Sequence, residues 1–300
     1  MIRNITNLTA SVRTRLLKIA KIKQRDFNAV LLQYFQERLL YRLSISPYRD
    51  KFVLKGALLF LVYDIPAARP TKDIDFLSRE MDNKEQNLLN LIREIIKIQV
   101  RDGVRFDPQS LGVETIQGNA AYKGIRIHCT AHLGKARRRF HIDIGFGDKV
   151  VPAPFELDFP VFLNEMPTPK LIAYSPDSTI AEKFEAIVNL GFLNSRMKDF
   201  FDIYHLANNR DFDSEILKKA LETTFKHRKT NLLNRFQIYS HGFINDTTNN
   251  RQWEAFKTKV SIKLSFTFAD TVNFIKNFIE PVFENDAKKN WKHRKLKWKK

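Results

Sequence analysis

Two aspartates one residue apart, Asp73 and Asp75, are the side chains whose type and spacing most clearly suggest chemistry. Charged and apolar residues alternate over 73–77, which predicts a strand with both carboxylates on one face. Two carboxylates about 4 Å apart repel by about 4 kcal/mol at an effective dielectric near 20. A divalent cation relieves this repulsion, and Mg²⁺ suits carboxylates combined with substrate phosphates. The alternative is a solvated edge strand with two surface aspartates.

The residues just before this pair favour the metal interpretation. A short apolar strand is expected over 52–54, followed by Gly56, Ala57 and a buried helix over 57–63. The open backbone at Gly56 and the N–H groups at the start of that helix are suited to grip a triphosphate.

A third carboxylate, Asp143, stands between two isoleucines on a second predicted strand, 139–145. If this strand lies beside the 73–77 strand, three carboxylates would hold two Mg²⁺ ions. Two ions about 3.5–4 Å apart would activate the attacking oxygen and stabilise a leaving pyrophosphate, as nucleotidyl transfer requires.

A second group of candidate residues lies in predicted helices at 178–190 and 196–208. Lys183 falls at the edge of an apolar stripe, so it either extends along the surface with its ammonium in water or reaches into a site. Arg196, Asp199 and Asp202 fall off the apolar stripe of the second helix. Lys198 and Asp202 are spaced i, i+4, so a surface ion pair is the simpler interpretation of that part.

The charge balance points to a polyanionic partner. Lysine and arginine number 51 against 33 acids, a net charge of +18, and eight of the last thirteen residues are basic. Binding to a phosphate backbone is driven by released counterions, and tryptophans among basic residues can stack on unpaired bases. We therefore expect the segment 288–300 to be a basic tail, either disordered or binding nucleic acid through these six residues: Lys288, Lys289, Trp291, Arg294, Lys295 and Trp298.

Composition excludes several classes of protein. A hydrophobic fraction of 43% with 25 phenylalanines rules out disorder of the whole chain. The single cysteine, Cys129, excludes an internal disulfide and fits a reducing compartment. No run of about 18 apolar residues and no signal-peptide pattern is seen, so we expect a cytoplasmic protein that does not span a membrane.

The patterns predict an α/β (α+β) protein with a mixed sheet followed by helices. Amphipathic periodicity predicts helices over 8–24 and 26–45, and five prolines fall within 152–169. We expect an α/β core over 1–150, a proline-rich linker over 151–169, a helical domain over 170–287 and the basic tail over 288–300. The polar segment 226–250 is expected to be a loop.

Four blocks in order resemble the AbiEii/AbiGii-type toxin nucleotidyltransferases of bacterial toxin–antitoxin and phage-defence pairs. They are RDKFVLKGALLF from Arg49, RPTKDIDFL from Arg69, DIGFGD from Asp143 and IAEKFEAIVNLGFLNSRMKDFFD from Ile180. The resemblance implies a nucleotidyltransferase α/β core, a helical C-terminal domain and a cognate antitoxin.

The resemblance also implies roles for these residues. Asp73 and Asp75 correspond to the metal-binding pair, with Asp143 as a candidate third ligand. Lys183, with Asp199 or Asp202, corresponds to the family's C-terminal catalytic pair, and the lysine is expected to hold the triphosphate together with Gly56, Ala57 and Arg196. The family commonly has Gly-Ser or Gly-Gly where this chain has Gly56-Ala57, so no hydroxyl is available there for a phosphate.

Three functions remain open from the sequence. The first is a Mg²⁺-dependent toxin that transfers a nucleoside monophosphate from an NTP to an RNA end, above all the 3′ acceptor end of tRNA, and so blocks translation. The second is nucleotidylation of a protein hydroxyl. The third is a nucleic-acid-binding module whose catalytic site is degenerate, to which only Ala57 points.

Overall fold

The computed structural model describes residues 8–63, 65, 71–116, 124–260, 265–284 and 289–299. The chain forms two compact units. Unit 1 comprises residues 1–62, 70–147 and 155–173, and unit 2 comprises 63–69, 148–154 and 174–300. The described helices do not combine the length and the apolarity that a membrane span needs.

Unit 1 is built on a seven-stranded mixed sheet in the order β3-β4-β5-β2-β1-β7-β6. Its strands are β1 (Phe52–Lys55), β2 (Asp73–Ser78), β3 (Arg105–Ile116), β4 (Gly124–Leu133), β5 (Ala136–Gly145), β6 (Phe155–Asp158) and β7 (Lys170–Ala173). The pairs β2/β5 and β1/β7 are parallel and the remaining pairs are antiparallel. The α/β class with a mixed sheet is therefore confirmed.

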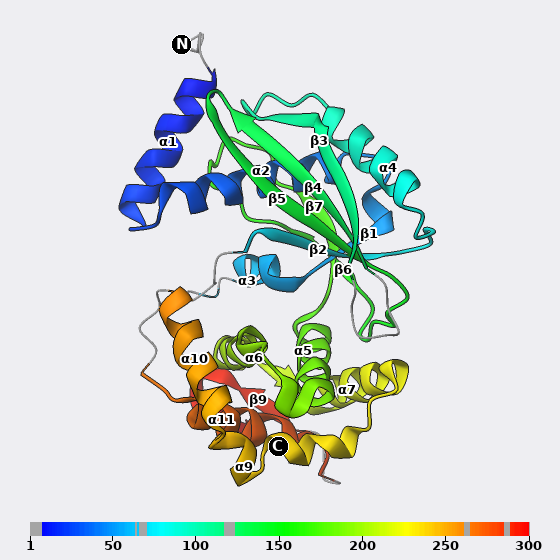
Figure 1. Ribbon diagram of the computed structural model, residues 1–300, viewed down its shortest axis with the longest axis vertical. Helices are drawn as coiled ribbons and strands as arrows, with labels where there is room; N and C mark the ends of the chain where they lie inside the picture. Colours follow the sequence, from blue (N-terminus) through cyan, green and yellow to red (C-terminus); the bar gives the residue numbers. More distant parts are fainter. Residues whose placement is uncertain are drawn as a thin grey trace. The chain divides into compact units, whose positions relative to one another are not determined.

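The helices of unit 1 are α1 (Leu8–Ile22), α2 (Phe27–Ser44), the short α3 (Leu59–Val62) and α4 (Glu85–Lys97). Asp26 caps α2 by accepting a hydrogen bond from the Ala29 N–H at 3.0 Å. Leu39 of α2 and Ile92 of α4 pack with Phe76 and Ile142 on one face of the sheet, and both helices can be followed in Figure 1. Strand alternation leaves the odd-numbered residues of β2 and β5 on the opposite face.

Unit 2 is helical, with one small sheet. Its helices are α5 (Pro176–Leu190), α6 (Met197–Asn209), α7 (Ser214–Arg228), α8 (Arg235–Ile238), α9 (His241–Ile244), α10 (Thr247–Val260) and α11 (Phe268–Ile279). A cluster of aromatic rings forms its core, where Phe200 and Phe243 both pack on Phe268, with ring centroids 5.1 and 5.9 Å away. The expected loop over 226–250 instead contains α8, α9 and the start of α10.

The expected boundaries of the domains differ from these units. The proline-rich segment 151–169 is not only a linker, because β6 lies within it and pairs with β7 at the edge of the unit 1 sheet. Its prolines fall outside β6. Prolines are also tolerated beside an edge strand, because one side of such a strand needs no N–H for pairing. The expected tail also departs from prediction, since β9 (Asn290–Lys292) and β10 (Lys297–Lys299) form a sheet with β8 (Phe212–Asp213).

Candidate active site

The two aspartates of the first pair lie on one face of β2, as the alternation predicts. Asp73 and Asp75 are half-exposed, whereas Ile74 and Phe76 between and beside them are buried. The apolar side chains anchor the strand under α2 and α4, so the carboxylates are held on the face that these helices do not cover.

Asp143 joins this face from the neighbouring strand. β5 runs parallel to β2, and Asp143 is the register partner of Asp75, so the expected adjacency of the two strands is confirmed. Both oxygens of Asp143 accept hydrogen bonds from Arg126 of β4, at 2.8 and 2.7 Å. The hydrogen bonds to Asp143 raise the pKa of Arg126, although burial alone would lower it. This bidentate pair fixes the third carboxylate.

Gly56 lies directly against the acidic pair. Its φ of +74° is unfavourable for other residues, and a Cβ built on it would come within 2.1 Å of the Asp75 Oδ2 atom. Position 56 therefore needs glycine for two reasons, namely the positive φ and the close approach of the Asp75 carboxylate. Ala57 follows in a 3₁₀ turn (Gly56–Leu58), and its methyl group is buried.

Two histidines that the sequence analysis did not single out complete this surface. The His141 Nδ1 atom lies 3.0 Å from Asp73 Oδ1, and the His128 ring lies 4.9 Å from the His141 ring. His141 is two residues before Asp143, so strand alternation could have placed it on the carboxylate face. We name the carboxylate face by its central residues: Asp73, Asp75, Arg126, His128, His141 and Asp143.

The donor atoms of this face partly fit a magnesium ion. Asp73 and Asp75 supply hard oxygen ligands, which Mg²⁺ combines with substrate phosphates and water. Asp143 is engaged by Arg126, so it would have to exchange that partner to serve as a third ligand. Within the described ranges, no group of three or more His, Cys, Asp or Glu side chains is arranged to hold a metal ion. A three-carboxylate site thus remains a prediction.

The second group of candidate residues is a buried ion-pair cluster in unit 2. The Lys183 Nζ atom of α5 lies 3.0 Å from Asp199 Oδ1 and 2.7 Å from Asp202 Oδ2, both in α6. The side chains of Asp199 and Asp202 are 0% and 1% exposed. The interpretation of Asp202 as a surface partner of Lys198 is therefore wrong, because Asp202 faces α5 rather than solvent.

Arg196 completes this cluster at the start of α6. Its Nε atom lies 2.6 Å from Asp199 Oδ2. Burial alone would raise the pKa of Asp199, but Lys183, Arg196 and Lys198 together lower it below its ordinary value. Three cations therefore keep this buried carboxylate charged. The structure brings all four unit 2 candidates together, namely Lys183, Arg196, Asp199 and Asp202.

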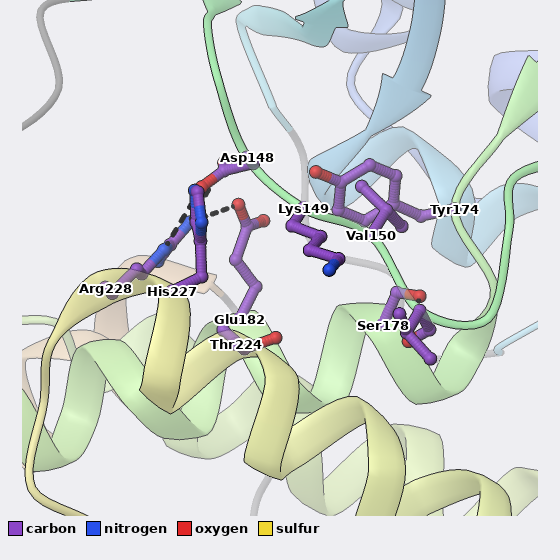
Figure 2. Close-up of a pocket in the computed structure, with 10 residues that line it drawn as sticks. Asp148, Lys149, Val150, Tyr174, Ser178, Glu182, Thr224, His227 and Arg228 are labelled. Carbon is purple, nitrogen blue, oxygen red and sulfur yellow. Dashed lines mark hydrogen bonds and ion pairs between the residues drawn. The ribbon is translucent and has the colours of Figure 1, made fainter.

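A second charged cluster in unit 2 is centred on Arg228, beside a small pocket (Figure 2). Arg228 contacts Asp148 at 3.0 Å, Glu182 at 2.5 Å and Glu185 at 2.9 Å. Burial lowers the pKa of Arg228, but these three carboxylates raise it overall. Asp148, the last residue of the DIGFGD block, is thereby joined to the helix that carries Lys183.

The C-terminal residues differ most from expectation. Trp291 is buried, and its indole N–H donates to the Ala207 carbonyl at 2.7 Å. Its ring packs on Phe278, with centroids 5.0 Å apart. The role of Trp291 in stacking on a base is therefore wrong, because both its ring and its N–H are used in the core. The Trp298 ring lies nearly parallel to the Phe278 ring at 5.8 Å and also contacts the Trp291 ring at 5.7 Å.

The basic residues of this segment are only partly available. Lys289 pairs with Glu284 at 2.9 Å, whereas Arg294 and Lys295 are exposed. Lys288 lies outside the described residues. Nucleic-acid binding by the remaining cations stays a prediction.

A family model described as the nucleotidyl transferase AbiEii toxin of type IV toxin–antitoxin systems matches residues 38–295. The chain belongs to the AbiEii family. The match includes the carboxylate face of unit 1 and the ion-pair cluster of unit 2. AbiEii membership makes the chain a nucleotidyltransferase-type toxin of a toxin–antitoxin system, and this confirms the resemblance seen in the sequence.

Two solved structures from Helicobacter pylori match this chain with low similarity. JHP933 is 13% identical, with a TM-score of 0.47 over 90% of this chain and 94% of that one. A protein described as a "putative nucleotidyltransferase" is 14% identical, with a TM-score of 0.46 over 87% of this chain and 100% of that one. At this level of similarity neither supports a functional argument. No curated protein matches the chain.

Proposed function

We propose that this AbiEii protein transfers a nucleoside monophosphate from an NTP to an RNA end, with the acceptor end of tRNA as the preferred substrate, and so blocks translation. The observation that carries the proposal is the carboxylate face, where Asp73 and Asp75 share one face of β2 beside Gly56. Two adjacent, half-exposed carboxylates next to close-approaching backbone are what a metal-bound triphosphate needs. The net charge of +18 favours RNA over a small-molecule acceptor.

Each residue of the carboxylate face has a distinct part in this proposal. Asp73 and Asp75 hold the cation, and His141 orients Asp73 through its 3.0 Å contact. Mg²⁺, when bound, neutralises charge on the transferring phosphate and on the leaving pyrophosphate. Gly56 keeps the backbone close to Asp75, and the N–H groups of Gly56 and Ala57 contact the phosphates. Asp143 is the candidate third ligand once it is released from Arg126.

The ion-pair cluster of unit 2 is a candidate anion-binding group in this proposal. Lys183 and Arg196 bind the triphosphate, while Asp199 and Asp202 position the lysine through contacts of 3.0 and 2.7 Å. A lysine held between two buried carboxylates has little freedom to turn away, so its ammonium is preorganised for an anion.

The test is transfer of label. The protein is incubated with each labelled NTP, with Mg²⁺ and with either bulk tRNA or cell protein. The Asp73→Ala/Asp75→Ala variant is compared with Asp50→Ala/Asp158→Ala, which removes two exposed acids elsewhere in unit 1. Label in RNA that disappears only in the first variant supports the proposal.

The other outcomes identify the alternatives. Label in protein alone would show that a protein hydroxyl is the acceptor. Absence of label with intact RNA binding would show a degenerate binding module. Growth arrest in cells that lack the antitoxin links either activity to toxicity, and equal toxicity of the Asp73/Asp75 variant would exclude carboxylate-dependent transfer as its cause.

A further inference from the structure

We propose that the exposed arginines on strands β3 and β5, on the same sheet face as Asp73 and Asp75, bind the phosphate backbone of the RNA that carries the acceptor end. We call Arg105, Arg137 and Arg139 the arginine row. This inference rests on the proposed function, because it assigns the path of the substrate toward that site.

Strand alternation separates neighbouring arginines of β5 onto two faces. Arg137 and Arg139 lie at odd positions, as do His141 and Asp143, so all four share the carboxylate face. Arg138, between them, points to the other face, where its guanidinium donates to Asn28 of α2. The three consecutive arginines 137–139 therefore face opposite sides of the sheet, with Arg138 alone on the helix-covered side.

The register of the sheet extends this arrangement to the neighbouring strands. Arg105 of β3 is the partner of His132 of β4, and His132 is the partner of Arg137. Thr130 of β4 is likewise the partner of Arg139. The three arginines thus lie beside the polar residues Thr130 and His132 of β4, and the long β4–β5 hairpin that carries two of them is visible in Figure 1.

The arginine row is not used by the protein itself. In the part of the chain that the structure describes, Arg105, Arg137 and Arg139 are exposed and their side chains make no hydrogen bond or ion pair. Asp107 also lies on this face, but its carboxylate accepts the Gln109 N–H at 3.0 Å. Burial, together with Arg105 and Arg137, lowers the pKa of His132. Among the described residues, three arginines against the single acid Asp107 leave this part of the face with a net positive charge, which is complementary to a polyanion.

The spacing along β5 suits a nucleic acid that ends at the acidic pair. A strand rises about 3.3 Å per residue, so Arg139 lies about 13 Å and Arg137 about 20 Å from Asp143 along β5. Successive stacked nucleotides rise about 3.4 Å along one strand. The arginine row would therefore meet phosphates about four and about six nucleotides from the reacting end. An acidic protein surface would match the charge but would have no reason to run toward the carboxylates.

The experiment measures RNA binding and its salt dependence, with Arg138→Ala as a matched control. Binding of a fluorescent single-stranded RNA of about twelve nucleotides is titrated at several salt concentrations for the wild type, Arg137→Ala, Arg139→Ala and the double variant. Removing one arginine–phosphate interaction should weaken binding about tenfold and reduce the log–log salt slope by about 0.7. Arg138→Ala should leave the salt slope unchanged. Thermal melting of each variant confirms that it is folded.

Oligonucleotide length separates the path from a general charge effect. An RNA of about three nucleotides, with its 3′ end at the carboxylate face, is too short to reach Arg139. Its transfer rate should be the same in the wild type and in the double variant, while the longer RNA should show a raised KM with kcat unchanged. Loss of activity on both lengths would overturn the proposed path.

Failure of this inference is distinguishable from failure of the proposed function. If the double variant binds the longer RNA as the wild type does, the arginine row is not the path, whatever the transfer assay shows. If that variant also escapes neutralisation by the antitoxin, the row is a protein-docking surface. If the wild type binds RNA and the double variant binds it more weakly as expected, but no label is transferred, the arginine row holds and the proposed reaction is wrong.

Discussion

The carboxylates of the two units are held in opposite ways. On the carboxylate face of unit 1, the side chain of Asp73 is 34% exposed and touches a single histidine. In the ion-pair cluster of unit 2, Asp199 is fully buried between Lys183 and Arg196. An exposed carboxylate can exchange its partners for a ligand, whereas a buried one is bound to fixed cations that the fold requires. The carboxylate of Asp73 is therefore open to a ligand, whereas that of Asp199 is already bound by cations of the protein.

The largest expected effect comes from the exposed pair. Asp73→Asn/Asp75→Asn should lower the rate of nucleotidyl transfer by at least about 10³-fold, because the cation loses its ligands and with them several kcal/mol of transition-state stabilisation. Single-turnover transfer of a labelled NTP measures this effect. The same variant should melt within a few degrees of the wild type, since neither side chain is buried. A variant that is unfolded would remove the contrast between the two units.

Asp199→Asn should act first on stability. It leaves Lys183 and Arg196 with one carboxylate fewer in a buried setting, and breaking a buried ion pair costs about 3–5 kcal/mol. Urea denaturation measures the loss. Lys183→Met in combination with Asp199→Asn and Asp202→Asn should recover much of the stability without restoring transfer, because no charge is then left buried. An Asp199→Asn protein as stable as the wild type would show that the cluster has no structural role.

The pH dependence of unfolding sharpens the comparison with a third buried carboxylate, Glu37 of α2. Glu37 is 1% exposed, with Arg38 2.7 Å from it and the Phe162 N–H 2.8 Å from it. Burial raises the pKa of Glu37 to about 7 despite the single arginine. For Asp199, three cations outweigh burial. The number of nearby cations therefore decides whether a buried acid stays charged.

The two acids should give opposite pH effects on the free energy of unfolding. Since Glu37 binds its proton more tightly in the folded state, stability should fall by about 3 kcal/mol as pH rises from about 4.5 to about 7. Glu37→Gln should remove that fall. Asp199 has a lowered folded pKa, so its contribution is present above about pH 4 and is lost as pH falls through the folded pKa. Urea midpoints across this pH range, for wild type, Glu37→Gln and Asp199→Asn, test both signs.

Gly56→Ala should cost about 1–3 kcal/mol of stability, through the positive φ and the Asp75 contact. Its effect on transfer should exceed its effect on stability, because the added methyl group displaces a carboxylate of the pair. Ala57→Gly, which leaves Asp75 in place, is the control. Thermal melting and transfer assays on both variants decide the point, and normal transfer by Gly56→Ala would mean that Asp75 needs no close backbone.

The sequence predicts the elements whose periodicity is strong. The helices over 8–24 and 26–45, the aspartate-bearing strand over 73–77 and the strand over 139–145 all appear close to their expected places. The long strand β3 and the helices within 226–250 were missed, because polar residues there mask the apolar period, and their packing partners lie far along the chain. Periodicity reports which side chains face a core, but not which distant segment supplies it.

The site was predictable to the same extent. Alternation placed Asp73 and Asp75 on one face, and the resemblance pointed to Lys183, Asp199 and Asp202. The pairing of Asp143 with Arg126 and of Asp73 with His141 depends on strand order, which a single sequence does not specify. The burial of Trp291 was missed because composition suggested a solvated tail, whereas β9 pairs with β8 and places the indole against Phe278.

Residues 290–299 have a structural role, because β9 and β10 form a sheet with β8. Because Trp291 fills the space beside Phe278, removing residues 289–300 would open a large apolar void in the helical unit. A chain without residues 289–299 should therefore lose activity because unit 2 is destabilised rather than because surface charge is lost.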